Sequence, residues 1–343
     1  KAKYAGSFIG NEGYRKQVYE WLMGGISSTL AHDVIATPGG TGAVNITLSQ
    51  CLDAGECVLL PDIAWGSYAL MATMANLNIA TYPMFAGDHF DMAGFRSACE
   101  AILQTQDKLV VVINDPCHNP TGYSLSKQEW QEIIAILNEC GKQAPVVLLN
   151  DIAYMDYSYD LDHSRDHFQL FHALSEQVMV VVAFSCSKSL TSYGLRCGAA
   201  VVLGQKEEDV RCVRIVFEKA ARAMWSNIPN AAMDNFTYVT TENKEAYLWE
   251  KAKYIDLLEK RSSIFVKEAK QAGLAIYPYK EGFFITLAMA DNELRDRYHK
   301  ALMDQLIFTV KVNRGIRVAI CSLCVKDCHG LALRMKQILD QVR

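Results

Sequence analysis

Short, almost wholly apolar runs alternate along the chain with longer segments in which apolar residues recur every three or four positions. The short runs are CVLLP (57–61), NIATYP (78–83), KLVVVIN (108–114), PVVLLN (145–150), VMVVVAF (178–184) and AAVVLG (199–204). Runs of this kind favour parallel strands that are covered on both faces. Between two of them, the spacing of SKQEWQEIIAILNECG (126–141) predicts a helix. Strands that alternate with helices predict an α/β sheet.

The pattern changes after Pro229. A long charged segment with helical spacing runs from Asn243 to Gly273, and its length predicts a helix that connects two domains. Beyond it we expect a strand over FFITLAM (283–289), a helix near 291–305, a strand over RVAICSL (317–323) and a last helix from about Asp327. We therefore predict a large domain at residues 1–255 and a smaller α+β domain at residues 256–343.

The composition excludes several classes of protein. Of the 343 residues, 50% are hydrophobic and 21% are charged, which is ordinary for a globular protein, and the net charge of -4 argues against nucleic-acid binding. No apolar run approaches the roughly 18 residues that span a membrane. Eleven scattered cysteines without paired CxxC spacing favour reduced thiols in a cytoplasmic enzyme, and we expect no metal site. The sequence begins with Lys1 and not with methionine, which leaves open whether a segment precedes it.

Polar residues follow the predicted strands, at the sheet edge where ligands bind in open α/β folds. Asn119 lies in DPCHNPTG after the third run, and Asp151 and Tyr154 lie in DIAY after the fourth. Ser185 and Lys188 lie in SCSK after the fifth. Ahead of all these, ATPGGTGAVNITLSQC places a glycine-rich turn before a helical pattern, and the N-terminus of such a helix attracts phosphate.

Each of these features alone also has a purely structural explanation. GGTG and NPTG can be plain turns, Asp151 can be a helix N-cap, and Lys188 can be a surface lysine just past a strand. Together, all at strand ends, they form the set that serves a lysine Schiff base with pyridoxal phosphate. That cofactor needs an amine nucleophile, a carboxylate facing its pyridine nitrogen, donors near its phenolate oxygen and a phosphate clamp.

The same segments resemble a known family. SCSKSLTSYGLRCG (185–198) resembles the lysine motif of the fold-type I pyridoxal-phosphate aminotransferases, the class I family of aspartate and aromatic aminotransferases. DPCHNPTG, NDIAY, PGGTGA and DIAWGSY resemble its Asn-Pro-Thr-Gly element, its Asp-x-Ala-Tyr element, its phosphate loop and the segment of its stacking tryptophan. The match runs in order from about Tyr4 to Leu323. It implies the PLP-dependent transferase fold, in which a large domain with a mostly parallel seven-stranded sheet flanked by helices carries a smaller α+β C-terminal domain.

The resemblance implies roles for individual residues around the cofactor. Lys188 would form the Schiff base and would also move the proton between the substrate Cα and the cofactor's C4′. Asp151 would pair with the pyridine nitrogen. The expected catalytic residues are Lys188, Asp151 and Tyr154. Tyr154 and Asn119 would hydrogen-bond the phenolate oxygen, and Trp65 would stack on the ring, unless it is only a core tryptophan. The phosphate would be held by Gly40, Thr41, Ser185, Arg196 and, from a partner subunit, Tyr4.

Two arginines are expected to bind the substrate, together with Asn119 and Trp65. Arg317 leads the strand-like RVAICSL and matches the arginine that binds the α-carboxylate in the family, and Arg314 is the competing candidate. Arg222 in RAMWSNIP resembles an arginine that binds the distal carboxylate from the neighbouring subunit, and the alternative is a helix-surface arginine.

The function that the resemblance implies is amino-group exchange between an L-amino acid (aspartate, glutamate or aromatic) and a 2-oxo acid such as 2-oxoglutarate. It implies a ping-pong mechanism in amino-acid metabolism and a homodimer with shared active sites. A β-lyase or decarboxylase on the same fold, or a non-catalytic regulatory module that binds the cofactor, stays open. The chain departs from the family at Tyr68, where the family has histidine, and in the glycine spacing after Tyr4. In the family, a segment before the position of Tyr4 helps to close over substrate.

Overall fold

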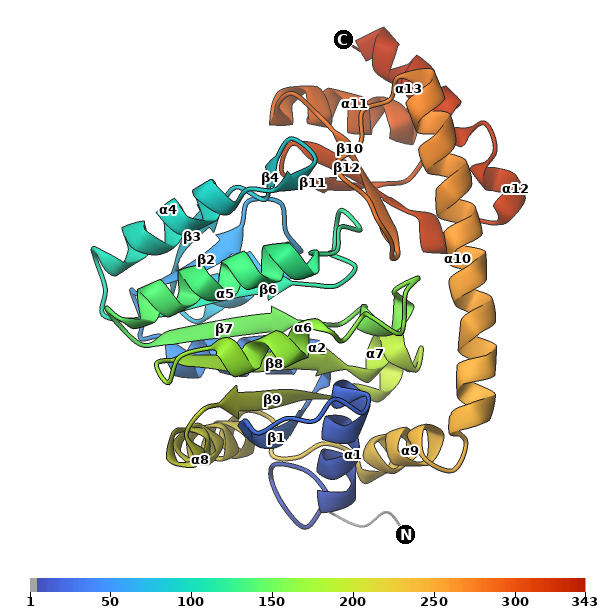
Figure 1. Cartoon of the computed structure of the whole chain (residues 1–343). Helices are drawn as coiled ribbons and strands as arrows, with labels where there is room; N and C mark the ends of the chain where they lie inside the picture. Colours follow the sequence, from blue (N-terminus) through green and yellow to red (C-terminus); the bar gives the residue numbers. More distant parts are fainter. Residues whose placement is uncertain (1–4, 343) are drawn as a thin grey trace.

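A seven-stranded sheet forms the middle layer of the larger part of the molecule in the computed structural model, which describes residues 5–342 (Figure 1). The strand order is β1-β9-β8-β7-β6-β2-β3. The strands are β1 (Ala31–Thr37), β2 (Cys57–Pro61), β3 (Asn78–Tyr82), β6 (Leu109–Asn114), β7 (Val146–Asp151), β8 (Val178–Ser185) and β9 (Gly198–Gly204). A two-stranded hairpin of β4 (Phe85–Ala86) and β5 (His89–Phe90) lies apart from this sheet.

The sheet is mostly parallel, as predicted. Neighbouring strands from β3 to β8 pair in parallel, whereas β9 pairs antiparallel with both β8 and β1. The six predicted strands are therefore confirmed, but the parallel direction expected for AAVVLG is wrong. A strand that is buried on both faces needs the same apolar residues in either direction, so its composition does not specify the direction.

The seventh strand, β1, was not predicted from the sequence. It lies at the edge of the sheet, and its first three residues are exposed or half-buried while its last four are buried. An edge strand tolerates polar residues, and β1 contains His32 and Asp33. The apolar part of β1 is therefore too short to be recognised as a strand from the sequence.

The strands bury alternate side chains on opposite faces of the sheet. In β8, Val180, Val182 and Phe184 belong to one apolar cluster, and Val181 and Ala183 belong to another. This period of two is the side-chain geometry of an extended strand, so each residue of the run contributes to one of two cores.

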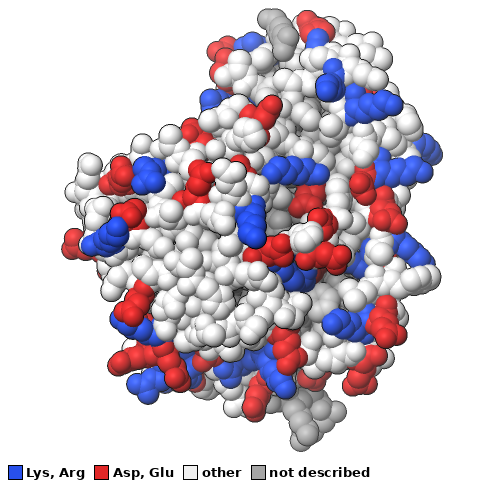
Figure 2. Space-filling view, viewed as in Figure 1, with Lys and Arg blue, Asp and Glu red and all other residues white. Residues whose placement is uncertain are grey.

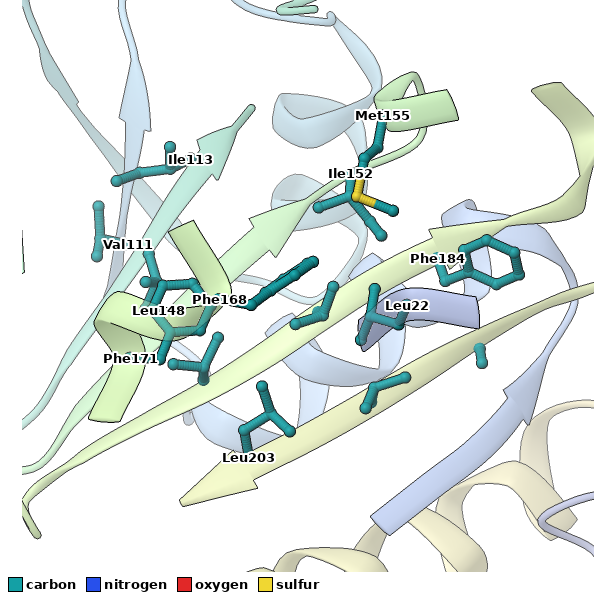
Figure 3. Close-up of a cluster of buried hydrophobic side chains, with 14 of the residues drawn as sticks. Leu22, Val111, Ile113, Leu148, Ile152, Met155, Phe168, Phe171, Phe184 and Leu203 are labelled. Atoms are coloured by element: carbon teal, nitrogen blue, oxygen red, sulfur yellow. The ribbon is translucent and has the colours of Figure 1, made fainter. Parts of the chain in front are cut away.

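Helices cover both faces. The first cluster, part of which is drawn in Figure 3, takes Leu22 from α1 (Glu12–Met23) and Phe168 and Phe171 from the segment after β7. The helices of the larger part are α1 (Glu12–Met23), α2 (Gly39–Cys51), α3 (Ser67–Met74), α4 (Met92–Leu103), α5 (Lys127–Gly141), α6 (His167–Leu170), α7 (Cys186–Ser189), α8 (Glu207–Met224) and α9 (Asn230–Thr240).

The predicted helix over 126–141 is confirmed as α5, and its start has a clear local cause. The Ser126 hydroxyl accepts a hydrogen bond from the Glu129 backbone N–H, and the Glu129 carboxylate accepts one from the Ser126 backbone N–H. This capping box satisfies two backbone donors that a helix N-terminus otherwise leaves without partners.

A smaller three-stranded antiparallel sheet of order β10-β12-β11 forms the C-terminal part, which has its own apolar cluster. Its elements are β10 (Phe284–Ala288), α11 (Asn292–Asp304), β11 (Val310–Val312), β12 (Gly315–Ala319), α12 (Val325–Cys328) and α13 (Leu331–Val342). The strand predicted over RVAICSL begins two residues earlier and ends at Ala319, where a short 3-10 helix, Ile320–Ser322, follows. The predicted last helix is two helices separated by Gly330, which has a φ of 75°.

The predicted connecting helix is confirmed as α10 (Lys244–Ala272), which ends at Gly273 in the left-handed conformation. Its 29 residues span about 43 Å and run alongside both parts of the molecule (Figure 1). The proposed boundary at residue 256 lies within α10, and a continuous helix does not mark where one domain ends and the next begins. That boundary stays a prediction.

Basic and acidic side chains are interspersed on the face shown in Figure 2. None of the helices within residues 5–342 is long and apolar enough to cross a bilayer. The same residues contain no group of three or more His, Cys, Asp or Glu side chains that could hold a metal ion.

Candidate active site

A cavity beyond the carboxyl ends of β6, β7 and β8 brings together nine of the residues predicted from the sequence. They are Gly40, Thr41, Trp65, Asn119, Asp151, Tyr154, Ser185, Lys188 and Arg196. Four further residues line it and were not predicted as site residues: Tyr68, Asn114, Ala153 and Ser187. Parallel strands bring their carboxyl ends to the same edge, which is why segments far apart in the sequence meet here.

Lys188 lies on α7, directly after β8, with its amine between two tyrosine rings. Its Nζ is 5.6 Å from the ring centroid of Tyr154 and 5.3 Å from that of Tyr193. Burial lowers the pKa of Lys188, Arg196 lowers it further, and Asp151 acts in the opposite direction. A lysine with a lowered pKa holds more of the neutral amine near pH 7, which is the form that acts as a nucleophile.

Asp151 ends β7 and is only 5% exposed. Its carboxylate accepts hydrogen bonds from the Tyr68 hydroxyl at 2.5 Å and from the Ala153 backbone N–H at 3.0 Å. Burial raises the pKa of Asp151, and these two hydrogen bonds and Lys188 lower it in part. The departure from the family at Tyr68 therefore places a phenol donor on this carboxylate. The sequence signal that could have identified Tyr68 as a site residue was its position three residues after Trp65.

The turn after β6 positions Asn119 between the two parts of the molecule. The Asn119 backbone N–H donates to the Asn114 side chain at 2.7 Å, and its side-chain amide donates to the Tyr154 hydroxyl at 3.4 Å. Burial raises the pKa of Tyr154, so its hydroxyl stays protonated and can donate in turn. The Asn119 side-chain oxygen accepts a hydrogen bond from Arg317 at 2.9 Å.

Gly122 joins this turn to the C-terminal part. Its carbonyl accepts hydrogen bonds from the backbone N–H groups of Lys280 and Glu281 at 2.8 and 2.9 Å. Its φ is 73°, and an added Cβ would lie 2.6 Å from the Glu281 carbonyl oxygen. Only glycine fits this close approach without strain.

His118, in the same turn, makes the stability of the fold depend on pH. Burial lowers the pKa of His118 to about 3, whereas an unfolded histidine titrates near 6.5. Below pH 6.5, His118 is therefore protonated in the unfolded chain but stays neutral in the folded chain, so the free energy of unfolding decreases as the pH falls. Between pH 8 and pH 5 this one residue should cost about 2 kcal/mol.

A His118→Asn variant keeps a donor near Thr121, the partner of His118 Nδ1, and removes this titration. Urea unfolding at pH 8 and pH 5 measures the effect. We expect the wild type to lose about 2 kcal/mol more than the variant between these pH values. Equal losses in the two proteins would contradict the assignment of a buried, neutral His118.

Of the two competing arginines, Arg317 reaches the edge of the cavity, where it donates to the side chain of Asn119. Its guanidinium carbon lies 4.3 Å from the ring centroid of Phe284, and its buried Nε has no hydrogen-bond partner among residues 5–342. Arg314 is exposed and pairs with Asp62 at 3.1 Å. Arg317 lines a cleft of about 610 Å³ that shares Trp65 and Tyr68 with the cavity, so this cleft adjoins the cavity that contains Lys188.

The opposite end of the cavity is suited to an anion. Helix α2 begins after Pro38, which provides no side-chain cap, so its first backbone N–H groups have no side-chain acceptor. Arg196, with a φ of 49°, approaches so closely that a Cβ on Gly39 would lie 2.6 Å from its Nη2. A helix N-terminus, an arginine and the Ser185 hydroxyl together form an anion-binding corner.

Two predicted residues are not brought to the cavity within one chain. Arg222 is exposed at the end of α8, with its guanidinium carbon 4.9 Å from the ring centroid of Phe8. It does not line the cavity or the adjoining cleft. Tyr4 lies outside the described residues.

Comparison with known proteins identifies the family. The family model described as aminotransferase class I and II matches residues 2–330. The chain belongs to this family. The chain is similar to the aromatic-amino-acid aminotransferase of Pseudomonas aeruginosa, with 28% identity over 71% of this chain and 61% of the relative. It is also similar to the tyrosine aminotransferase of Rhizobium meliloti, with 31% identity over 65% of this chain and 57% of the relative. The matches thus span less than two thirds of these relatives.

Solved structures of aminotransferases agree with the fold. An aminotransferase from Anaerococcus prevotii has a TM-score of 0.93 and 34% identity, covering 98% of this chain and 82% of that one. An aromatic-amino-acid aminotransferase from Burkholderia pseudomallei, covalently bound to pyridoxal phosphate, has a TM-score of 0.79 and 20% identity, covering 99% and 84%. At 20% identity the second likeness shows the fold alone. The fold class inferred from the strand pattern and the lysine motif is therefore confirmed.

Proposed function

We propose that this chain is a pyridoxal-phosphate-dependent aminotransferase that exchanges an amino group between an L-amino acid and a 2-oxo acid. The observation that carries the proposal is the amine of Lys188, its pKa lowered by burial, in one cavity with the buried carboxylate of Asp151. The family, and the cofactor on the Burkholderia pseudomallei structure, support it.

The donor set fits pyridoxal phosphate from end to end. The uncapped N-terminus of α2, with Gly40 and Thr41, and the Ser185 and Arg196 side chains would hold the phosphate. Asp151 would hold the protonated pyridine nitrogen, because a buried carboxylate with a raised pKa is stabilised by a cationic partner. The remaining contacts would come from Trp65 at the ring face and from Asn119 and Tyr154 at the phenolate oxygen.

When bound, pyridoxal phosphate supplies an electron-withdrawing ring that stabilises negative charge at the substrate Cα. The chain's own residues do the remaining work. Arg317 binds the α-carboxylate through its free guanidinium N–H groups, while its bond to Asn119 fixes its orientation. The Lys188 amine would take the proton from the substrate Cα as a general base and deliver it, as a general acid, to the C4′ carbon of the cofactor. The two half-reactions alternate on one site, which is a ping-pong scheme.

A half-reaction experiment tests the reaction type. The protein is loaded with pyridoxal phosphate, freed of excess, and mixed with aspartate or phenylalanine without any 2-oxo acid acceptor. We expect no more than one 2-oxo acid per site, and steady turnover only after 2-oxoglutarate is added. With a cysteine S-conjugate as the sole substrate, continuous release of pyruvate and ammonia would indicate a β-lyase. Release of carbon dioxide from aspartate or phenylalanine would indicate a decarboxylase. Cofactor binding with no product would indicate a regulatory module.

We further propose that the active enzyme is a homodimer in which Arg222 reaches the partner's site and selects substrates with a second carboxylate. The exposed position of Arg222, away from its own cavity, supports this arrangement. Tyr4 is proposed to bind the cofactor phosphate in the same way. The chain's free cysteines support a cytoplasmic location in amino-acid metabolism, and residue 256 is the proposed domain boundary.

Replacing Arg222 should change specificity more than activity. An Arg222→Gln variant loses a charged partner for the distal carboxylate, so we expect kcat/KM for aspartate to fall by about 10- to 100-fold. The value for phenylalanine should change by less than about threefold, because that substrate has no second carboxylate. Steady-state kinetics with both substrates measures this, and Arg211→Gln, also exposed on α8, is the matched control.

Mixed dimers test the shared site separately. A dimer of one Lys188→Ala chain and one Arg222→Gln chain has one complete site only when Arg222 acts across the interface. Aspartate activity should therefore rise when the two variants are mixed and allowed to exchange subunits. If the mixture is no more active than the sum of its components, Arg222 does not act in trans.

A further inference from the structure

The residue after Lys188 is held by the long helix α10. The backbone carbonyl of Ser189 accepts a hydrogen bond from the Tyr247 hydroxyl at 2.5 Å and another from the Lys251 amine at 2.6 Å. Tyr247 and Lys251 are four residues apart, so they lie on the same face of α10 one turn from each other. Two donors on the carbonyl next to the reactive lysine fix the short helix α7 from outside the cavity.

Lys251 is buried to an extent that is unusual for a lysine. It is 5% exposed, and its Nζ lies 3.8 Å from the ring centroid of Tyr157. Burial lowers its pKa to about 8, and the nearby Asp156 offsets part of that effect. Burying a charged amine is costly unless it is paired and hydrogen-bonded, so the bond to Ser189 is the main polar contact that keeps it in place.

Close packing does not explain the position of these two side chains. Cavities of about 470 and 320 Å³ are each lined by both Tyr247 and Lys251. Open space therefore adjoins both side chains, although Lys251 itself is buried. Their shared hydrogen bonds to Ser189 are therefore the contacts that define where they point.

The Ser189 side chain lies near the buried Asp156. Burial raises the pKa of Asp156, but Arg165, Lys251 and the Ser189 side chain lower it below its ordinary value. Asp156 accepts further hydrogen bonds from Trp21 Nε1 at 3.1 Å and from Arg165 at 2.6 Å. The turn that carries Lys188 thus lies next to Asp156, in the 3-10 helix Met155–Tyr157 after β7, and is hydrogen-bonded to α10.

The same helix binds the segment that carries Arg317. Ten residues beyond Lys251, which is about 15 Å along the helix, the Arg261 guanidinium donates to the Cys321 carbonyl at 2.9 Å. Cys321 lies four residues after Arg317, in the short 3-10 helix that follows β12. Helix α10 therefore contacts both the segment that carries the reactive amine and the segment that carries the carboxylate-binding arginine.

We propose that Tyr247 and Lys251 are positioning residues. Through their hydrogen bonds to Ser189, the rigid helix α10 would keep the Lys188 amine at a fixed distance from Arg317. This inference rests on the proposed function, because it concerns the attachment of pyridoxal phosphate at Lys188 and the proton transfer that follows. Neither residue touches the reacting atoms. Both act through the backbone of Ser189.

The test measures how fast Lys188 reacts with pyridoxal phosphate. Apoprotein is mixed with saturating cofactor, quenched with borohydride at set times, and the modified Lys188 peptide is quantified by mass spectrometry. We expect Lys251→Met to slow modification about tenfold and Tyr247→Phe about threefold, because each removes one donor to Ser189. Lys251→Arg, which keeps a charged donor, should stay within about threefold of wild type. Lys253→Met, on an exposed part of α10, is the matched control.

Steady-state kinetics supplies a second readout. A loss of positioning should lower kcat with a smaller change in KM, since Arg317 still binds the α-carboxylate. Tyr247→Phe carries no charge change, so it decides the question if Lys251→Met unfolds, which thermal unfolding reveals. Modification rates for Tyr247→Phe and folded Lys251→Met that equal the wild-type rate would overturn the proposal. If wild-type Lys188 is not modified at all, the proposed function fails and this inference fails with it.

Discussion

Replacing Lys188 by alanine is expected to lower the rate of amino-group transfer by a factor of about 10⁴. The variant loses both the nucleophile that attaches the cofactor and the base that moves the Cα proton, and no other lysine lines the cavity within the described residues. Pre-steady-state mixing of the loaded variant with aspartate measures the rate of 2-oxo acid formation. The fold should be unaffected, because a lysine whose pKa is lowered by burial contributes little to stability.

The control for this variant is Lys253→Ala, which removes an exposed lysine from α10 and should keep wild-type activity. A Lys188→Ala protein that retains more than about one hundredth of the wild-type rate would contradict the role of Lys188. In that case another amine or a water-mediated path would have to carry the proton.

The second large effect is expected for Asp151→Asn. Asparagine has nearly the same shape and can still accept the hydrogen bond from Tyr68, but it cannot carry the negative charge that keeps a pyridine nitrogen protonated. We expect kcat to fall by a factor of about 10² to 10³, the usual cost of removing one electrostatic stabiliser from an enclosed site. Steady-state kinetics at saturating cofactor measures this change.

The same variant should not be less stable than the wild type. Burial raises the pKa of Asp151, so above that pKa the folded state holds a carboxylate that would be better solvated in the unfolded state. Removing the charge relieves this cost, and we expect an equal or higher melting temperature for the apoprotein. Asp107→Asn, at an exposed turn, is the control, and neither quantity should change there. A catalytic loss of less than tenfold would contradict the assignment of Asp151 to the pyridine nitrogen.

The sequence predicted the part of the site that follows from strand ends. Asn119, Asp151 and Lys188 each follow a long apolar run, and parallel strands bring such positions to one edge. The glycine-rich turn before α2 was predicted from its own local pattern, glycines followed by a helical segment, because the strand that precedes it, β1, was not predicted. These features depend on local pattern and on one general rule of topology, so a single sequence carries them.

Other features depend on contacts that local pattern does not encode. Tyr68 was visible only as a departure from a family motif, and its hydrogen bond to Asp151 requires α3 to sit at the sheet edge. The choice between Arg317 and Arg314 was open because both flank the start of the same strand, and the backbone register decides which one faces the cavity. The hydrogen bonds from α10 to Ser189 come from Tyr247 and Lys251, which follow Ser189 by 58 and 62 positions in the sequence. Local periodicity does not encode contacts over such separations.

The central claim is that Lys188 attaches pyridoxal phosphate, and peptide mapping tests it most directly. Purified apoprotein is incubated with pyridoxal phosphate, reduced with borohydride, digested and analysed by mass spectrometry, with unreduced protein alongside. The account predicts one reduced cofactor per chain, on the peptide that contains Lys188, and none on that peptide without reduction. Modification of other lysines in preference to Lys188, or no modification of any peptide, would contradict it.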